Sequence, residues 1–192
     1  MGGVLIAKQL SSSNKNTLAT KLQSEGFTLI EDNNTQWNDT LSKYNQVKEK
    51  GEEVFTPSTI DLTVDQLKQK CSSLLKSETY SQNDKDKASR WCTMPISVKA
   101  RIEKQGRRVL SDTDNDQKDK DVWDALVKNH LSAEAKNKMN VSVSALNGSG
   151  VDDARINEMR KGCKALKDKT SLDKDYLSDY SKFQDWCSIS TK

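Results

Sequence analysis

The tryptophans and cysteines of this 192-residue chain follow one order that occurs twice. Each occurrence has a tryptophan, then a cysteine, then an adjacent Trp-Cys pair. The first comprises Trp37, Cys71, Trp91 and Cys92, and the second comprises Trp123, Cys163, Trp186 and Cys187. Tryptophans spaced among leucines on helices are usually core anchors rather than ligand-stacking residues. We therefore predict a tandem duplication of one small unit, with the four tryptophans in its cores.

Apolar residues and glycines recur with the tryptophans. Leu22 and Gly26 are matched by Ile102 and Gly106, 80 residues later. The second copy then contains the extra polar run DTDNDQKDKD, and the offset around the first cysteine of each copy rises to 92 residues. These shifts predict insertions in loops, and they divide the chain into a first copy at 17–95 and a second copy at 96–192.

Residues 1–16 precede the first copy and form a leader. Its apolar part, Val4 to Ala7, is shorter than the ~7–15 residues of a signal-peptide core and far shorter than the ~20 of a membrane span. Two interpretations stay open: a polar N-terminal extension, or the trimmed remnant of a longer apolar leader that would associate with a membrane.

Composition and periodicity favour an all-α fold. The chain has two prolines, 31% charged residues and a net charge of +3. Trp37, Leu41 and Tyr44 share one face of a predicted helix. Capping signals predict further helix starts at Thr63 and Ser81. We expect eight short helices, four in each copy, with the copies related by a pseudo-twofold axis.

One segment is expected to depart from helix. Residues 140–144 read Asn-Val-Ser-Val-Ser, and this alternation of polar and apolar residues predicts a short strand.

The cysteine spacings leave two interpretations. The close CxxC pairs of common zinc and redox sites do not occur. In one interpretation each copy closes its own disulfide, Cys71–Cys92 and Cys163–Cys187, which implies an oxidising compartment. In the other, all four are reduced core thiols of a cytoplasmic protein. We favour the disulfides, since the same spacing occurs in both copies.

Other polar features favour structural roles. His130 aligns with Tyr44 and is expected to replace it as a half-buried aromatic ring. The run from Asp112 to Asp116 resembles the start of a calcium-binding loop, but it lacks the glycine and glutamate that such a loop requires, so we expect a solvated insertion. The basic residues of 99–108 predict a solvated helix face. We predict no metal site, no cofactor, no catalytic residue and no nucleic-acid partner.

The motifs taken together support a resemblance. The order GFTLI, a Trp-led helix with KY, LKQKCSSLL, RWCTMPISV and a second cycle ending in DWC resembles paralogous families of uncharacterised proteins of haemotropic mycoplasmas, over residues 17–189. The resemblance implies a multicopy, surface-displayed product that serves host interaction or antigenic variation, with a host or other surface protein as partner. It implies no activity and no catalytic residues.

We therefore expect a non-catalytic interaction protein or surface antigen outside the cytoplasm. Its rigid helical frame would expose the loops at 31–34, 112–121 and 147–150. The alternative is an enzyme with a carboxylate-based site between the two copies, which requires a deep cleft lined by acidic residues of raised pKa.

Overall fold

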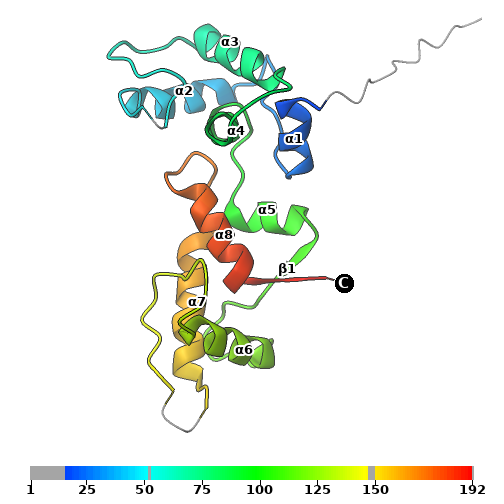
Figure 1. Cartoon of the computed structure of the whole chain (residues 1–192), viewed down its shortest axis with the longest axis vertical. Helices are drawn as coiled ribbons and strands as arrows, with labels where there is room; N and C mark the ends of the chain where they lie inside the picture. Colours follow the sequence, from blue (N-terminus) through cyan, green and yellow to red (C-terminus); the bar gives the residue numbers. More distant parts are fainter. Residues whose placement is uncertain (1–15, 52, 147–149, 192) are drawn as a thin grey trace, which may run out of the picture.

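A computed structural model describes residues 16–51, 53–146 and 150–191, and this part of the chain is mainly helical. The first half, 17–95, contains α1 (Leu18–Ser24), α2 (Gln36–Gln46), α3 (Val64–Leu75) and α4 (Gln82–Trp91). The second half, 96–191, contains α5 (Val98–Lys104), β1 (Arg107–Val109), α6 (Lys120–Leu131), α7 (Asp153–Lys167), α8 (Tyr176–Trp186) and β2 (Ser188–Ser190). Figure 1 shows α1–α4 at one end of an elongated molecule and α6 at the other, with α5 and α8 between them.

Side-chain caps fix several helix starts. Thr63 and Gln66 form a capping box at the start of α3, and Ser81 and Asp84 form a second at α4. Asp152 caps α7 by accepting a hydrogen bond from the backbone N–H of Arg155. Each such cap satisfies N–H groups that have no partner inside the helix, and typically contributes about 1 kcal/mol. The helix starts predicted at Thr63 and Ser81 are confirmed.

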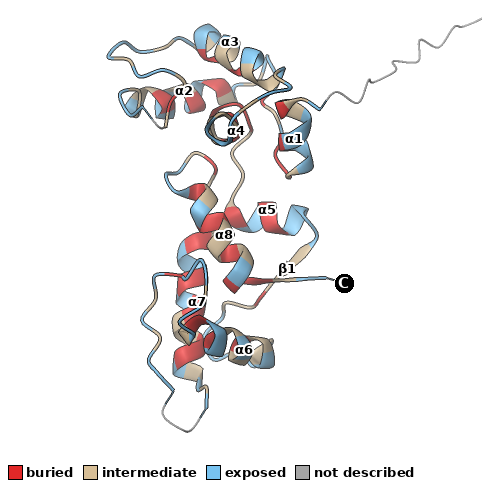
Figure 2. Cartoon of the chain, in the orientation of Figure 1, coloured by how far each residue is buried: buried red, intermediate tan, exposed pale blue. Residues whose placement is uncertain are grey.

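Each half has an apolar core built around two tryptophans. Trp91 and Trp123 are fully buried, and Trp37 and Trp186 are at most 5% exposed. Buried and exposed residues alternate around the helices, as Figure 2 shows, so each helix packs one face inward. No helix within the described ranges is long and apolar enough to span a bilayer.

The indole groups make matching contacts in the two halves. The Nε1–H of Trp91 donates to the carbonyl oxygen of Glu53 at 2.7 Å, and that of Trp186 donates to the carbonyl oxygen of Asn137, also at 2.7 Å. In each case the last tryptophan of the half fixes the loop that follows the second helix. The two loops are thereby fastened at equivalent points, although they differ in length and sequence.

Short strand contacts also match. Leu29 forms an antiparallel bridge with Thr93 in the first half. In the second half the corresponding contact extends into the pair β1–β2, with Val109 opposite Ser188. In the described residues, this small sheet and two isolated bridges, Leu29–Thr93 and Ser97–Thr170, are the departures from an all-α fold.

The strand predicted at 140–144 is wrong. The segment has no regular secondary structure and lies against α7, where Val141 and Val143 are partly buried. Its carbonyl groups at Ser144 and Ala145 accept hydrogen bonds from the guanidinium of Arg155 instead of from another strand. The alternation in sequence therefore reflects packing on a helix surface, not pairing in a sheet.

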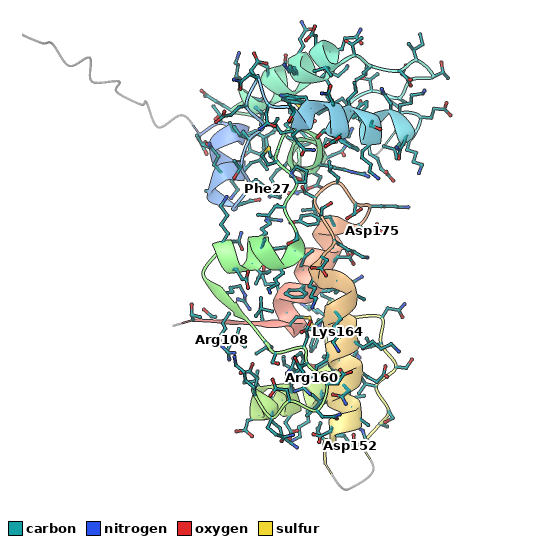
Figure 3. The ribbon with its side chains drawn as sticks, turned by 180° about the vertical axis from the view of Figure 1, so that it is seen from behind. Phe27, Arg108, Asp152, Arg160, Lys164 and Asp175 are labelled. Carbon is teal, nitrogen blue, oxygen red and sulfur yellow. A yellow bond between two sulfur atoms is a disulfide. The ribbon has the colours of Figure 1, made fainter. Side chains whose placement is uncertain are left out.

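The two halves meet around one buried arginine, Arg101 of α5. Its guanidinium carbon lies 4.0 Å from the ring centroids of both Phe27 and Tyr180. Its Nε–H donates to the carbonyl oxygen of Glu25 at 3.0 Å, and Gln105 donates to the same oxygen at 2.8 Å. Figure 3 shows Phe27 on this side of the first half, facing α5. The sequence placed Arg101 on a solvated helix face, and that expectation is wrong.

Candidate functional site

Both predicted disulfides are present. Cys71 bonds Cys92 with their Cα atoms 5.5 Å apart, and Cys163 bonds Cys187 with a Cα separation of 5.7 Å. Both separations lie in the usual range for disulfides. Each bond ties the third helix of a half to the residue that follows its fourth helix. The cysteines are at most 2% exposed, so they serve the frame rather than a reactive surface.

A groove runs along one side of α3. Its volume is about 720 Å³, and its lining includes Ile30, Trp37, Leu75, Lys68 and Lys76. Asp32 and Glu78 also line it, so the groove combines apolar side chains with two lysines and two acidic residues. Such a mixture is typical of sites that bury an apolar contact and orient it with a few polar groups.

Lys68 closes one end of this groove. Its Nζ donates to the carbonyl oxygen of Asp32 at 2.5 Å and lies 6.0 Å from the ring centroid of Trp37. The short turn at 31–34 is held against α3 by this contact. The remainder of the groove extends to Leu75 and Lys76.

A second groove of about 850 Å³ follows the opposite side of α3. Phe55, Leu62 and Leu74 supply its apolar lining, and Lys70 and Asp84 lie among its polar residues. In the described residues, α3 therefore has a groove on each side of its exposed face.

In the second half, the chain itself covers the corresponding flanks of α7. Asp112 pairs with Lys167 at 2.7 Å, and Asp114 pairs with Lys164 at 2.8 Å. The insertion at 112–116 therefore follows α7, while Thr113, Asp114 and Asn115 stay exposed, so the expectation of a solvated insertion is confirmed and its ion pairs with α7 are an addition to it. Its acidic side chains meet lysines that are spaced three residues apart, one helical turn, on one face of α7.

Arg160 of α7 holds the far end of this insertion. It is 1% exposed, and its guanidinium donates to the carbonyl oxygen of Asp116 at 2.5 Å. The guanidinium carbon lies 5.8 Å from the ring centroid of Trp123. Arg160 thus repeats what Lys68 does at Trp37. Figure 3 shows Arg160 and Lys164 on α7.

The other flank of α7 is covered by the segment at 139–145. Gly162 permits this contact, since a Cβ at its position would lie 2.7 Å from Val141 and 3.0 Å from Met139. In α3, Lys70 stands one residue before Cys71, as Gly162 stands before Cys163. A side chain there prevents the same close approach.

The acidic insertion does not form a cation site. Asp112 and Asp114 face lysines, and Asp116 accepts a hydrogen bond from Ser111 Oγ at 2.5 Å. Across the ranges that the structure describes, no group of three or more His, Cys, Asp or Glu residues is arranged to hold a metal ion.

The junction between the halves contains a small hollow of about 150 Å³, next to Asp175 in Figure 3. Its size is well below the ~300–1,000 Å³ of usual ligand pockets. Glu53 in its wall pairs with Arg90 at 3.0 Å. Burial raises the pKa of Tyr176 to about 12, so its phenol stays protonated at neutral pH and is a poor general base.

Glu25 lies beside Arg101, and the pKa of its carboxyl is shifted in the opposite direction from that of a general acid. Burial alone would raise the pKa of its carboxyl, but hydrogen bonds and charge from Lys85 and Lys21 outweigh that effect and lower the pKa below its usual value. A carboxylate-based site at the junction would need the opposite shift.

His130 is buried beside Trp186, with ring centroids 4.9 Å apart in an edge-to-face arrangement. Tyr44 contacts Trp91 in the same way at 5.1 Å. Desolvation lowers the pKa of His130, a hydrogen bond with the backbone of Met139 partly opposes this, and the charge of Lys138 lowers it further. The imidazole is therefore a packing residue that resists protonation.

This burial predicts acid sensitivity that depends on His130. Because its folded pKa is below the unfolded value of about 6.5, the unfolded chain binds the proton better, and stability is lost as the pH falls through that value. The variant His130→Tyr should lose less unfolding free energy than the wild type between pH 7.5 and pH 5.5. Urea unfolding at several pH values measures this difference. The reciprocal variant Tyr44→His should lose more, and parallel curves for all three proteins would contradict the prediction.

The fold and its covalent links define a mainly helical protein whose two halves are each closed by a disulfide. No protein-family model, no curated protein and no solved structure matches the chain. The two grooves beside α3 are the candidate binding surfaces of the described structure.

Proposed function

We propose that the chain is a tandem duplication whose two copies serve as a rigid frame for displayed binding segments. The matching contacts support the duplication. The two disulfides, the indole hydrogen bonds to Glu53 and Asn137, and the cation contacts of Lys68 and Arg160 occur at corresponding places in each half. Two halves of unrelated origin would not be expected to share so many contacts at corresponding positions.

The function that this frame supports best is non-catalytic interaction with another protein, as a surface antigen or adhesive protein would perform. One observation carries the proposal. The disulfide-linked cores are alike in the two halves, whereas the segments between them, 31–36 against 111–122 and 47–62 against 132–152, differ in length. Apart from Val54 and Met139, their described residues are exposed or half-buried. A constant frame with divergent surface segments is suited to presenting different contacts to partners.

The two disulfides of this frame support a location outside the cytosol. Structural disulfides persist outside the reducing cytosol. The resemblance to haemotropic mycoplasma paralogues supports display at the cell surface, with a host or other surface protein as partner.

Thiol mapping of the protein from its native source tests the proposal. Cells are lysed in an alkylating reagent without reductant, and the peptides are identified by mass spectrometry. Linked peptides containing Cys71–Cys92 and Cys163–Cys187, together with labelling of the protein on intact cells by a membrane-impermeant amine reagent, are the expected result. Four alkylated thiols, or labelling that requires lysis, would contradict surface display.

A further inference from the structure

We propose that the apolar leader segment 4–10 of the same chain docks into the groove between α3 and Trp37, so that a partner that uses this groove has to displace it. Residues 1–15 lie outside the described structure, but the point where the chain enters that structure is fixed. A contact within one chain goes beyond the proposed interaction function and does not depend on it.

The chain enters the described structure at one end of this groove. The backbone N–H of Leu18 donates to the carbonyl oxygen of Ser77 at 2.9 Å, which fixes the start of α1 beside the C-terminal end of α3. Thr17 and Ala19 line the groove, and so does Glu78, the residue after Ser77. The leader is therefore tethered directly at the groove.

The leader is long enough to reach every part of the groove. The groove follows α3 from Lys76 back to Lys68, a distance of about 12 Å at the rise of an α-helix. Residues 8–16 alone span up to about 30 Å when extended. The apolar run Val4–Ala7 can therefore lie beside Trp37 without strain in the connecting residues.

The lining favours an apolar occupant over a charged one. Its charged residues are two lysines and two acidic residues, so the groove has no net charge. Lys68 already pairs with Asp32 at 3.3 Å. Ile30, Trp37 and Leu75 supply the apolar part of the lining. An occupant gains more here by burying apolar side chains than by presenting charge.

The leader has side chains of that kind. Its apolar residues after Met1 are Val4, Leu5, Ile6, Ala7 and Leu10. It contains two lysines and no acidic residue, and Lys15 stands two residues before Thr17. Lys15 is thus expected to pair with Glu78, while the apolar run lies further along α3.

The second half covers the corresponding side of α7 with residues of its own chain. There the insertion at 112–116 is held by Lys164 and Lys167. In the first half the turn at 31–34 reaches Lys68 but is too short to continue along α3. The leader begins at this groove, and a short tether gives it an effective concentration in the millimolar range. A second copy or a foreign protein has to reach that concentration in solution.

NMR spectra of the oxidised, ¹⁵N-labelled full chain test the contact. The variant Leu5→Ser/Ile6→Ser removes two apolar side chains from the leader. It should shift the indole signal of Trp37 and the backbone amides of 72–76 relative to the wild type. The control Ser11→Ala/Ser12→Ala changes the leader outside the apolar run and should leave these signals in place. Both variants keep every described residue, so a damaged core does not account for the difference.

A peptide added in trans tests the same site. The probe is the capped peptide Gly-Val-Leu-Ile-Ala-Lys-Gln-Leu, which copies residues 3–10. It should shift the groove signals of Leu5→Ser/Ile6→Ser with a Kd on the order of 1 mM. It should bind the wild type about three-fold more weakly, because the tethered leader competes for the groove. The peptide with serine in place of its first leucine and its isoleucine is the matched control and should bind neither protein.

Three results would overturn the proposal. Identical groove signals in the wild type and in Leu5→Ser/Ile6→Ser would exclude the contact, and so would a peptide that binds both proteins equally. Differences that grow with protein concentration would identify the leader of a second copy as the occupant, against a contact within one chain. None of these results affects the thiol mapping, so docking of the leader can fail while surface display stands.

Discussion

Removing either disulfide by paired alanine substitution should lower the unfolding free energy by about 3 kcal/mol, within a range of about 2–5 kcal/mol. The bonds close chain segments with sequence separations of 21 and 24 residues, so their loss releases similar entropy in the unfolded chain. Urea unfolding of Cys71→Ala/Cys92→Ala and of Cys163→Ala/Cys187→Ala measures each effect. The control is Ser73→Ala, an exposed change on α3 that should stay within about 0.5 kcal/mol of the wild type.

The two double variants should differ in where protection is lost. In the first half, a groove lies on each side of α3, so loss of Cys71–Cys92 leaves this helix with few other contacts that hold it in place. In the second half, the insertion at 112–116 and the segment at 139–145 still hold α7. Hydrogen exchange should therefore accelerate more in α3 than in α7 after the matched substitutions. Equal losses in the two helices, or a total loss below about 1 kcal/mol, would contradict this account.

The sequence predicts the frame because its signals are local or repeated. Capping boxes at Thr63 and Ser81 act within one helical turn, and the recurrence of the cysteine spacing favours one disulfide within each half. The helical class, the helix number and both disulfides follow from such signals.

The candidate site depends on contacts that no local pattern encodes. Asp112 and Lys167 are 55 residues apart in sequence, and only the packing of the insertion on α7 brings them together. Gly162 gives no signal of a close approach until the segment at 139–145 is placed against it. The groove beside α3 is recognised by comparison with α7, whose corresponding side is covered. That comparison requires the folded structure of both halves.

The second large effect is expected at Arg101. The variant Arg101→Ala should lower the unfolding free energy by about 2–4 kcal/mol, because it removes the guanidinium between Phe27 and Tyr180 and one donor to the carbonyl oxygen of Glu25. One term opposes this loss: Nη1 of Arg101 is buried without a partner in the described structure, and removing it relieves a desolvation cost of about 1–3 kcal/mol. The loss of two ring contacts, a hydrogen bond and the packing of the side-chain stem destabilises the fold more than removal of this one unpaired group stabilises it.

Because these contacts join the halves, the loss should appear as weaker coupling between them. In Arg101→Ala, hydrogen exchange in α1 and in α8 should report different unfolding free energies, whereas in the wild type both should follow one cooperative transition. Arg101→Met keeps most of the stem and should recover part of the loss, which separates packing from charge. Lys99→Ala, an exposed change on the same helix, should leave both helices unaffected. If Arg101→Ala were no worse than Lys99→Ala, the halves would be held together by the linker and the remaining polar contacts alone, and the buried guanidinium would have no role in joining them.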